Sequence, residues 1–353
     1  MKTWKAIGLM SGSSLDGLDV AYCEFVKDKN GWKYEIKFAE TVDYSEKWKK
    51  ILKNIRDFKP EALIKAHNEY GILLGQTTDN FIKKYHLSPD IISSHGHTVF
   101  HNPAQGYTFQ LGNGQAVANV TGITTVADFR TGDILLGGQG APLVPVGDKL
   151  LFNDYQACVN IGGIANISYD DNGKRLAYDV CPANQLLNNL ALLTGKPFDK
   201  DGELAEQGLL NSKILSFFES DEFYRKPLPK SLSNEYVWKH FIKPLETYGD
   251  NVKDKLFTAS EHVAGKIAEA INNLNKGKIL ITGGGARNKF LIRKIRDKSY
   301  QKIIVPEPVL IDFKEALIFA FMGVLRVKNE INTFASATGA KHDAVVGVLF
   351  EKN

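Results

Sequence analysis

The sequence predicts an α/β protein of two lobes, because of its length, a strand pattern that occurs twice, and glycine-rich turns that follow buried strands. The chain of 353 residues is longer than the ~100–200 residues that one hydrophobic core usually serves. Apolar runs flank a glycine-containing turn near residue 12 and again near residue 162. We therefore expect each lobe to begin with a strand, a glycine turn and a second strand.

The first lobe is expected to continue from three strands into helices and two further buried strands. Apolar residues at helical spacing follow the third strand, and Pro60 stands where a helix tolerates proline. The expected strands are 5–10, 18–25, 32–40, 90–94 and 122–127, and the expected helices are 45–55 and 61–85.

The second lobe repeats the opening hairpin and then becomes mostly helical. Its expected strands are a pair over 157–168, bent at the double glycine, with 176–179 and 278–282. Its expected helices are 184–193, 235–241, 258–274, one from 288 and 312–327. We expect the first lobe to comprise residues 1–128 with a C-terminal return at 331–353, and the second lobe to comprise 129–330.

Composition describes an ordinary globular enzyme, with 43% hydrophobic and 24% charged residues. The formal charge of +4 arises from 44 basic and 40 acidic residues spread along the chain, without a long basic block, so no nucleic-acid partner is expected. Cys23, Cys158 and Cys181 are far apart, which favours a reducing, cytoplasmic location. No signal peptide and no apolar run of about 18 residues is evident, so no membrane association is expected.

The turn from Gly12 to Asp19 has the composition of an anion-binding site. Consecutive small residues let backbone N–H groups converge on a phosphate, and the hydroxyls of Ser13 and Ser14 add donors. Asp16 and Asp19 supply carboxylates that could handle magnesium. A plain hairpin turn is the alternative. The P-loop and dinucleotide-binding glycine patterns are both missing from the sequence.

A second glycine turn, Gly283-Gly284-Gly285, follows a strand and opens a helix near Asn288. Its backbone could approach adenine or present amides to a phosphate, although a tight strand-to-helix turn explains it equally well. Asp179 ends a predicted strand, a position from which a carboxylate can project into a cleft as a general base; the alternative is a helix cap or turn former.

Three histidines in Ser94-His-Gly-His-Thr98 and His101 suggest a metal cluster at first sight. Their spacing lacks the further ligands that zinc sites show, so a substrate-contacting loop is favoured over zinc. Asp128 and Arg130 are two residues apart after a predicted strand, so both side chains could bind the same polar ligand.

Taken together and in order, these segments resemble the anhydro-N-acetylmuramic acid kinases, a branch of the sugar kinase, actin and heat-shock ATPase superfamily. The resemblance runs nearly end to end. Its motifs are Gly8-Leu-Met-Ser-Gly-Ser-Ser-Leu-Asp-Gly-Leu-Asp19, Ser94-His-Gly-His-Thr98, Ala127-Asp-Phe-Arg130, Gly137-Gly-Gln-Gly-Ala-Pro-Leu-Val-Pro145, Val159-Asn-Ile-Gly-Gly-Ile-Ala-Asn-Ile167, Gly283-Gly-Gly-Ala-Arg-Asn288, Lys314-Glu-Ala316 and Thr338-Gly-Ala340.

The resemblance implies two ribonuclease-H-like lobes that flank a nucleotide and sugar cleft and close on their ligands. It implies that water opens the 1,6-anhydro bond of 1,6-anhydro-N-acetylmuramic acid while the 6-oxygen takes the γ-phosphoryl group of ATP. The product, N-acetylmuramic acid 6-phosphate, belongs to cell-wall recycling. ATP as co-substrate and Mg²⁺ follow from the same resemblance, and a homodimer would suit the family.

By similarity Asp179 would be the catalytic base that deprotonates the attacking water. His95, Asp128, Arg130 and Glu315 would bind the sugar, and the metal ligands stay unassigned. The expected ATP and phosphate residues are Gly12, Ser13, Ser14, Leu15, Asp16, Gly17, Leu18, Asp19, Gly162, Gly163, Gly283, Gly284, Gly285 and Asn288.

The sequence departs from the family pattern mainly on the sugar side. Where the family usually reads Asp-Thr-Gly-Pro-Gly-Asn and a second Asp, this chain has Asp179-Val-Cys-Pro-Ala-Asn184 and Asn188, and its Ser233-Asn-Glu235 replaces Gly-Arg-Glu. His97 stands where glutamine is usual. Two alternatives therefore stay open: a divergent paralogue that acts on another sugar, and an ATP-binding protein without this chemistry.

Overall fold

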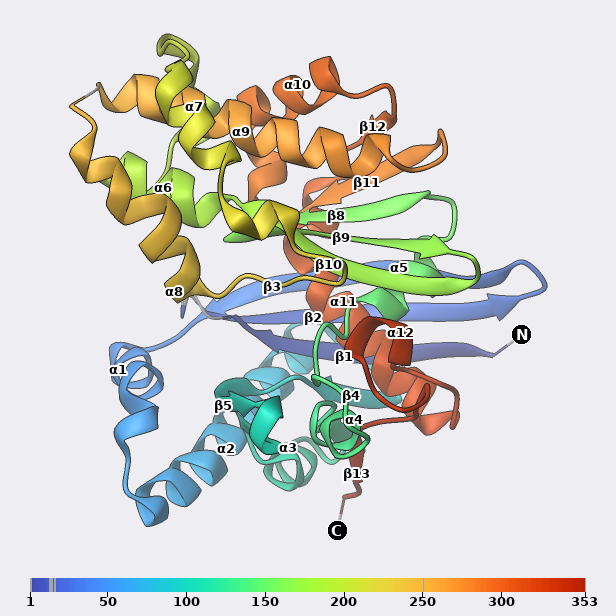
Figure 1. Cartoon of the computed structure of the whole chain (residues 1–353). Helices are drawn as coiled ribbons and strands as arrows, with labels where there is room; N and C mark the ends of the chain where they lie inside the picture. The colour runs from blue at the N-terminus through green and yellow to red at the C-terminus, as the bar shows by residue number, and fades with distance from the viewer. Residues whose placement is uncertain (1, 13–14, 16, 250, 353) are drawn as a thin grey trace. The chain divides into compact units, whose positions relative to one another are not determined.

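The computed structural model describes residues 2–12, 15, 17–249 and 251–352. The chain divides into two compact units, the first formed by Met1–Leu151 with Phe313–Asn353 and the second by Phe152–Asp312. Each unit is a sheet covered by helices (Figure 1). None of the helices in the described part of the chain combines the length and apolarity that a bilayer span requires.

The first unit contains a six-stranded sheet in the order β13-β7-β4-β1-β2-β3. β1 (Thr3–Ser11), β2 (Gly17–Asp28) and β3 (Gly31–Asp43) are antiparallel neighbours. β4 (Ile91–Ser94) and β7 (Thr125–Ala127) continue the sheet parallel to β1, and β13 (Val348–Phe350) closes the edge antiparallel to β7.

The second unit repeats this arrangement with five strands in the order β10-β9-β8-β11-β12. Three antiparallel strands are again followed by parallel ones. The strands are β8 (Ala157–Ile161), β9 (Ile164–Asp171), β10 (Lys174–Pro182), β11 (Lys278–Thr282) and β12 (Lys302–Ile304). The predicted α/β class with two ribonuclease-H-like lobes is therefore confirmed, and the repeated strand–turn–strand unit opens both lobes.

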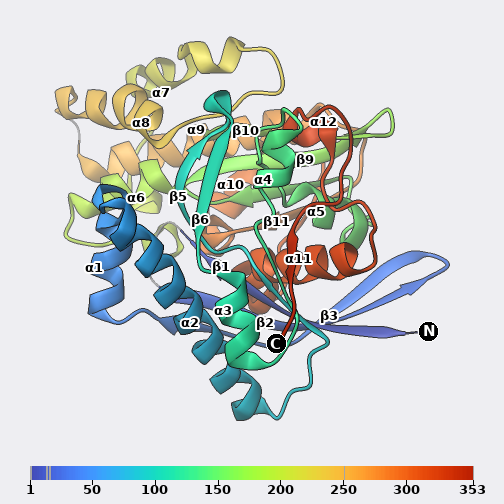
Figure 2. The ribbon, with the colours of Figure 1, turned by 90° about the horizontal axis from the view of Figure 1, so that it is seen from below.

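Helices cover both faces of the first sheet. Ile7 and Leu9 point into the core that α1 (Glu46–Asn54), α2 (Pro60–Tyr85) and α3 (Gly114–Thr121) cover; Figure 2 shows α2 and α3 side by side. Gly8 points to the other face, against α11 (Pro308–Val327). A Cβ at Gly8 would lie 1.9 Å from the carbonyl oxygen of Ala316, so only glycine permits this approach of helix and strand.

The core of the second unit forms between its sheet and four longer helices. Alternate strand residues such as Val159 and Ile281 contact Val263 of α9 and its neighbours in one buried cluster. These helices are α6 (Asn184–Leu192), α7 (Ser212–Glu219), α9 (Val252–Asn272) and α10 (Lys289–Lys298).

Shorter elements complete the two units, and several of them were not expected. The helix predicted at 235–241 is α8 (Asn234–Val237) followed by a π-helical turn at Trp238–Ile242. Gly122, expected to begin a strand, instead ends α3 with φ 68°. The other short elements are the hairpin β5 (His97–Asn102) and β6 (Tyr107–Leu111), and the helices α4 (Thr131–Leu135), α5 (Pro145–Leu151) and α12 (Ala335–Thr338).

The division between the units lies at 151/152 and 312/313, away from the expected 128/129 and 330/331. The helices α4 and α5 belong with the first sheet because side chains near them bond within the first unit. Arg130 donates to His95, and buried Asp148 pairs with Lys314 at 2.7 Å. The middle of α11 is held to the same sheet, since Ser93 Oγ donates to the carbonyl oxygen of Phe319.

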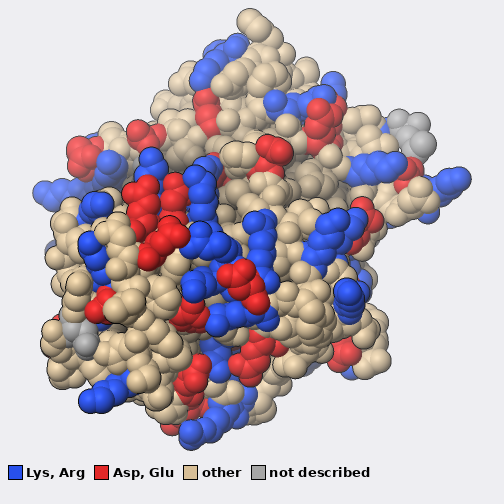
Figure 3. Space-filling view, turned by 90° about the horizontal axis from the view of Figure 1, so that it is seen from above, with Lys and Arg blue, Asp and Glu red and all other residues tan. Residues whose placement is uncertain are grey.

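Charged side chains of both signs are interspersed on the face seen in Figure 3. Ion pairs also occur in the second unit, where Glu261 pairs with Lys294 at 2.5 Å and with Lys298 at 2.8 Å. The net charge of +4 is thus not gathered into a single basic patch on this face.

Candidate functional site

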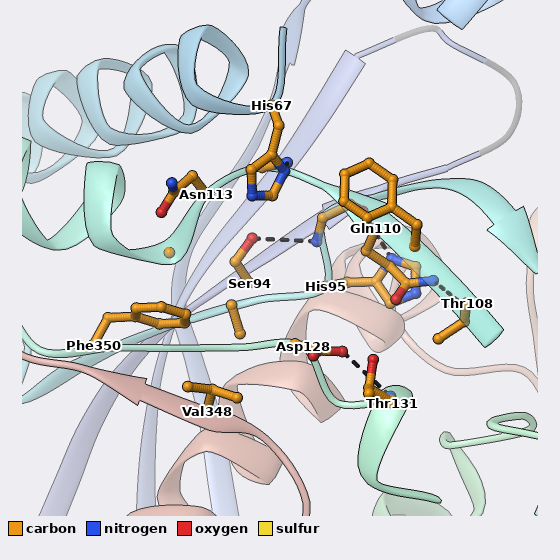
Figure 4. A pocket seen from close by; sticks show the side chains of 15 residues that line it. His67, Ser94, His95, Thr108, Gln110, Asn113, Asp128, Thr131, Val348 and Phe350 are labelled. Carbon is orange, nitrogen blue, oxygen red and sulfur yellow. Dashed lines mark hydrogen bonds between the residues drawn. The ribbon is translucent and has the colours of Figure 1, made fainter. Parts of the chain in front are cut away.

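A cavity of about 290 Å³ opens in the first unit at the carboxyl ends of β4 and β7, the edge at which open α/β sheets bind ligands. Figure 4 shows His67 and Asp128 on opposite sides of it, with Phe350 beside them. The lining residues are His67, Ser94, His95, Gly96, Thr108, Phe109, Gln110, Gly112, Asn113, Gly114, Ala127, Asp128, Thr131, Val348 and Phe350.

Two polar residues that sequence reasoning missed offer the cavity a donor and an acceptor. His67 Nδ1 accepts from the backbone N–H of Gly112 at 3.1 Å; burial lowers the pKa of His67, so the neutral ring carries its proton on Nε2. Gln110 Oε1 is buried and has no hydrogen-bond partner among the described residues. An isolated glutamine in a strand carries no sequence signal for such a role.

His95 and Arg130, both expected to bind the sugar, form one hydrogen-bonded unit. Arg130 Nη2 and Nε lie 2.8 and 3.1 Å from His95 Nε2, and Arg130 Nη1 donates to the carbonyl oxygen of Gly140 at 2.6 Å. Because Nε2 accepts, the ring is neutral and Nδ1–H donates to the carbonyl oxygen of Gly96 at 2.9 Å. Burial and then the Arg130 charge hold the pKa of His95 well below its usual range.

Arg130 keeps its charge at neutral pH and retains spare donors. Burial lowers its pKa only to about 10. A guanidinium has five N–H donors, and three of them serve the described partners His95 and Gly140. The remaining donors can address a carboxylate or hydroxyl of a ligand.

Asp133 holds this arrangement in place and was not anticipated. Its carboxylate is fully buried; Oδ2 accepts from the backbone N–H of Gly140 at 2.7 Å and Oδ1 from Thr338 Oγ1 at 2.7 Å. A Cβ at Gly138 would lie 2.2 Å from Oδ2. The glycine-rich motif and the Thr-Gly-Ala motif thus meet at one carboxylate, whose neighbour Gly140 binds Arg130.

Asp128 lines the cavity in a backbone conformation that disfavours non-glycine residues, with φ 57°. Its Oδ1 accepts from the backbone N–H of Thr131 at 3.2 Å and so caps the start of α4. Residues held in this region cluster at ligand-binding sites. Asp128 therefore combines a local capping role with a position in the cavity wall.

The segment expected to hold phosphates is described only in part, because Ser13, Ser14 and Asp16 lie outside the described residues. Gly12 follows β1, and Leu15 has φ 60°. Gly17, Leu18 and Asp19 belong to β2 rather than to the turn. The Leu18 side chain is 2% exposed and lies in the core, so only its backbone could face a ligand.

Two carboxylates of the first unit are suitable magnesium ligands. Asp19 Oδ1 accepts from Thr41 Oγ1 at 2.6 Å. Glu315 lies on α11, and most of the residue is exposed while its carboxyl group is buried. Burial of the carboxyl group raises the pKa of Glu315; the Lys314 and Arg130 charges lower this pKa and the Asp19 charge raises it. The two carboxyls thus lie within electrostatic range, and carboxylate oxygens with phosphate oxygens and water form the usual magnesium site.

The histidines of the β5 region are bonded to three different partners. His95 accepts from Arg130, His97 Nδ1 lies 3.1 Å from Ser11 Oγ, and His101 Nδ1 lies 3.1 Å from Thr108 Oγ1. Within the described ranges, no group of three or more His, Cys, Asp and Glu side chains could hold a metal ion.

In the second unit Asp179 lies on β10 and is anchored by the segment around Leu232. Its Oδ2 accepts from the backbone N–H of Leu232 at 2.8 Å, and its own N–H donates to the carbonyl oxygen of Lys230 at 2.9 Å. Burial raises its pKa, which the Leu232 hydrogen bond partly offsets. Helix α6 begins after Ala183 without a side-chain cap, so Asp179 does not cap it.

The two glycine turns of the second unit lie together. A Cβ at Gly285 would lie 2.2 Å from Ile161 Cγ2, and one at Gly283 would lie 2.6 Å from Asn160 Oδ1. The carbonyl oxygen of Gly163 accepts from the backbone of Ala183 at 2.9 Å. Gly162, Gly163, Gly283 and Gly284 thus cluster at the carboxyl ends of β8 and β11.

Asn288 has a structural task beside any role with the nucleotide. Its side chain caps α10 by accepting from the backbone N–H of Leu291 at 2.9 Å. The interpretation of this segment as a strand-to-helix turn thus explains Asn288 without a ligand, and the carbonyl oxygens of Gly283 and Gly285 likewise accept from Ala286 and Asn288 within the turn.

Comparison with known proteins identifies one family along nearly the whole chain. The sequence model described as "Anhydro-N-acetylmuramic acid kinase" matches residues 4–352. Proteins of that name from Hydrogenovibrio crunogenus and Vibrio cholerae are 34% and 33% identical, and each alignment covers 98% of this chain and 97% of the relative.

Among solved structures the similarities are distant. The activator of 2-hydroxyisocaproyl-CoA dehydratase from Clostridium difficile has a TM-score of 0.43 at 13% identity, over 92% of this chain and 97% of that chain. A ROK family glucokinase from Streptomyces griseus has a TM-score of 0.41 at 10% identity, over 90% of this chain and 98% of that one.

Proposed function

The chain belongs to the anhydro-N-acetylmuramic acid kinase family, and from that premise we propose that it converts 1,6-anhydro-N-acetylmuramic acid and ATP into N-acetylmuramic acid 6-phosphate and ADP. The oxygen of water bonds to the anomeric carbon as the bond from that carbon to the 6-oxygen breaks. The 6-oxygen bonds to the γ-phosphorus and ADP leaves. The proton of the water passes to a base.

The observation that carries this proposal is the setting of Asp179. One carboxylate oxygen is fixed by the Leu232 N–H at 2.8 Å, while Oδ1 has no hydrogen-bond partner among the described residues. A half-buried carboxylate with a raised pKa is a stronger base than a solvated one. Asp179 is thus suited to orient a water with one oxygen while the other keeps the side chain in position.

ATP is proposed to bind through backbone groups rather than through a lysine clamp. The turn at 12–19 would hold the phosphates, and the glycine cluster of the second unit would line the adenosine. Asp19 and Glu315 would hold Mg²⁺, which would neutralise the phosphate charge. Phosphoryl transfer depends mainly on such positioning and charge neutralisation.

The sugar is proposed to bind at the cavity of the first unit. His95 and Asp128 line it, and Arg130, fixed to His95, has donors left for an acidic or hydroxyl group. Beside these polar groups, Phe109 and Phe350 give the cavity an apolar wall, as ligand pockets typically have. A sugar that carries an acetamido group and a lactyl ether offers both kinds of surface.

A different sugar is the second candidate, favoured by the residues around Asp179. The Val180 and Ala183 side chains lie in the hydrophobic core, so the hydroxyl that the family usually has at position 180 is replaced by buried carbon. Asn234, where the family usually has arginine, begins α8. A sugar without the lactyl carboxylate would not need that cation.

The test is ADP formation with 1,6-anhydro-N-acetylmuramic acid, followed by the mass of the product. The proposed reaction adds both a phosphoryl group and a water. Phosphorylation of a free sugar hydroxyl without added water would instead show the second candidate. ATP binding without turnover of any anhydrosugar would identify a nucleotide-binding protein that lacks this chemistry.

Location and assembly follow from the family as predictions. We propose that the enzyme is cytoplasmic, because ATP and the recycled wall sugars are both present in the cytoplasm. We also propose that it forms a homodimer. Sedimentation of the purified protein at micromolar concentration measures the assembly state directly.

A further inference from the structure

Four buried side chains form a hydrogen-bonded chain beneath the start of the proposed phosphate-binding turn. Tyr44 OH donates to Ser11 Oγ at 2.8 Å, Tyr44 OH lies 2.6 Å from Tyr70 OH, and Ser11 Oγ lies 3.1 Å from His97 Nδ1. All four residues are less than 9% exposed. They come from the end of β1, the segment after β3, α2 and the first residue of β5.

The direction of each hydrogen bond follows from the count of protons. The Tyr44 proton goes to Ser11, so the Tyr70 hydroxyl must donate to Tyr44. With Tyr44 as its donor, Ser11 has its own proton left to donate to His97 Nδ1, which lies 3.1 Å away. Burial, followed by the nearby Arg56 charge, lowers the pKa of His97, which favours the neutral ring that can accept at Nδ1.

We infer that His97 is a positioning residue for the phosphate-binding turn, and that it acts by accepting a hydrogen bond from the Ser11 hydroxyl and so fixing the end of β1. Ser11 is the last residue of β1 and precedes Gly12 directly. The inference rests on the proposed assignment of the turn at 12–19 to the phosphates.

A buried chain of this kind fixes position because each member depends on the next. Loss of the acceptor at position 97 leaves the Ser11 hydroxyl without its partner in a buried site, which costs more than the bond itself is worth. A shift of the strand end would relieve the unpaired hydroxyl. A displacement of about 1 Å at a binding group is enough to lower activity ~100-fold.

The experiment measures binding of a non-hydrolysable ATP analogue by calorimetry to the full chain. His97→Ala removes the acceptor, His97→Gln restores one through its amide oxygen, and Tyr44→Phe removes the donor to Ser11. Tyr85→Phe is the matched control, because the Tyr85 hydroxyl bonds Glu40 at 3.1 Å, away from the chain.

We expect His97→Ala and Tyr44→Phe to weaken analogue binding about tenfold or more, while His97→Gln and Tyr85→Phe stay within about twofold of wild type, where tenfold corresponds to 1.4 kcal/mol. KM for the sugar should change less than KM for ATP. Wild-type affinity in His97→Ala would overturn the inference, as would a glutamine variant as weak as the alanine one. Because analogue binding needs no sugar turnover, a wild type inactive on anhydrosugar would contradict the proposed function without affecting this result.

Discussion

The imidazole Nε2 of His95 accepts hydrogen bonds from both Nη2 and Nε of Arg130, at 2.8 and 3.1 Å. A neutral histidine thereby orients a guanidinium without neutralising its charge, which stays available to a ligand. Arg130 can therefore be aimed at a substrate while remaining a full cation.

Arg130→Lys should raise KM for the sugar roughly 10–100-fold, because the three donors of a lysine could at most replace the two bonds to His95 and the one to Gly140, which leaves none for a ligand group. KM for ATP should change little. Steady-state kinetics with each substrate varied in turn checks this split. Equal changes in the two KM values would contradict a role on the sugar side.

Asp133→Asn should destabilise the first unit by about 2–3 kcal/mol, because an amide NH₂ would face the Gly140 N–H or the Thr338 hydroxyl where a carboxylate oxygen now accepts. KM for the sugar should rise with it, since Gly140 binds Arg130. Thr338→Val removes one donor and keeps the carboxylate, so its smaller loss of about 1 kcal/mol is the matched comparison. Urea unfolding measures both, and an asparagine variant as stable as wild type would contradict this role.

Gly8→Ala should prevent stable folding or lower stability by several kcal/mol, since the new methyl group would lie 1.9 Å from the Ala316 carbonyl oxygen. Gly265→Ala should instead raise the stability. Gly265 lies inside α9 with open space where a Cβ would be, and alanine is favoured over glycine in a helix by up to ~1 kcal/mol. Thermal unfolding of the two variants should shift in opposite directions.

The pH dependence of kcat/KM should reflect the protonation of Asp179. Its pKa lies above the ordinary value because burial disfavours the carboxylate, so kcat/KM for the sugar should fall as pH drops through that raised pKa. Leu232→Pro deletes the N–H that favours the charged form, which should raise the pKa further and move the acid limb to higher pH. Leu232→Val keeps the N–H and should leave the limb in place. If kcat/KM of Leu232→Pro falls at the same pH as that of the wild type, the Leu232 hydrogen bond does not set the pKa of Asp179.

Local patterns in the sequence predicted most of the fold. Alternating apolar residues with a glycine turn, near Gly12 and near Gly162, identified the hairpin that opens each lobe, and Pro60 marked the start of α2. The hairpin β5–β6 was missed, because its first strand, His97–Asn102, does not alternate between apolar and polar residues, although Tyr107–Leu111 does. The expected lobe boundaries also differ from those observed, since they depend on contacts such as Asp148 with Lys314 that no local pattern encodes.

The candidate site was only partly predictable for the same physical reason. His95, Asp128 and Arg130 were proposed from their motifs, and the structure brings them to one edge of the first sheet. Asp133 and Thr338 are separated by 205 residues, and only folding brings them together. Leu18 was expected to bind phosphate, yet its side chain belongs to the core, because a strand turns alternate residues to opposite faces.

Turnover of 1,6-anhydro-N-acetylmuramic acid by Asp179→Asn tests the central claim most directly. Asparagine keeps the shape and can still accept from the Leu232 N–H, but it cannot take a proton from water. Loss of a general base predicts a fall in kcat of roughly 10²–10⁴-fold, with binding of the ATP analogue unchanged. Wild-type turnover in this variant would show that Asp179 is not the base.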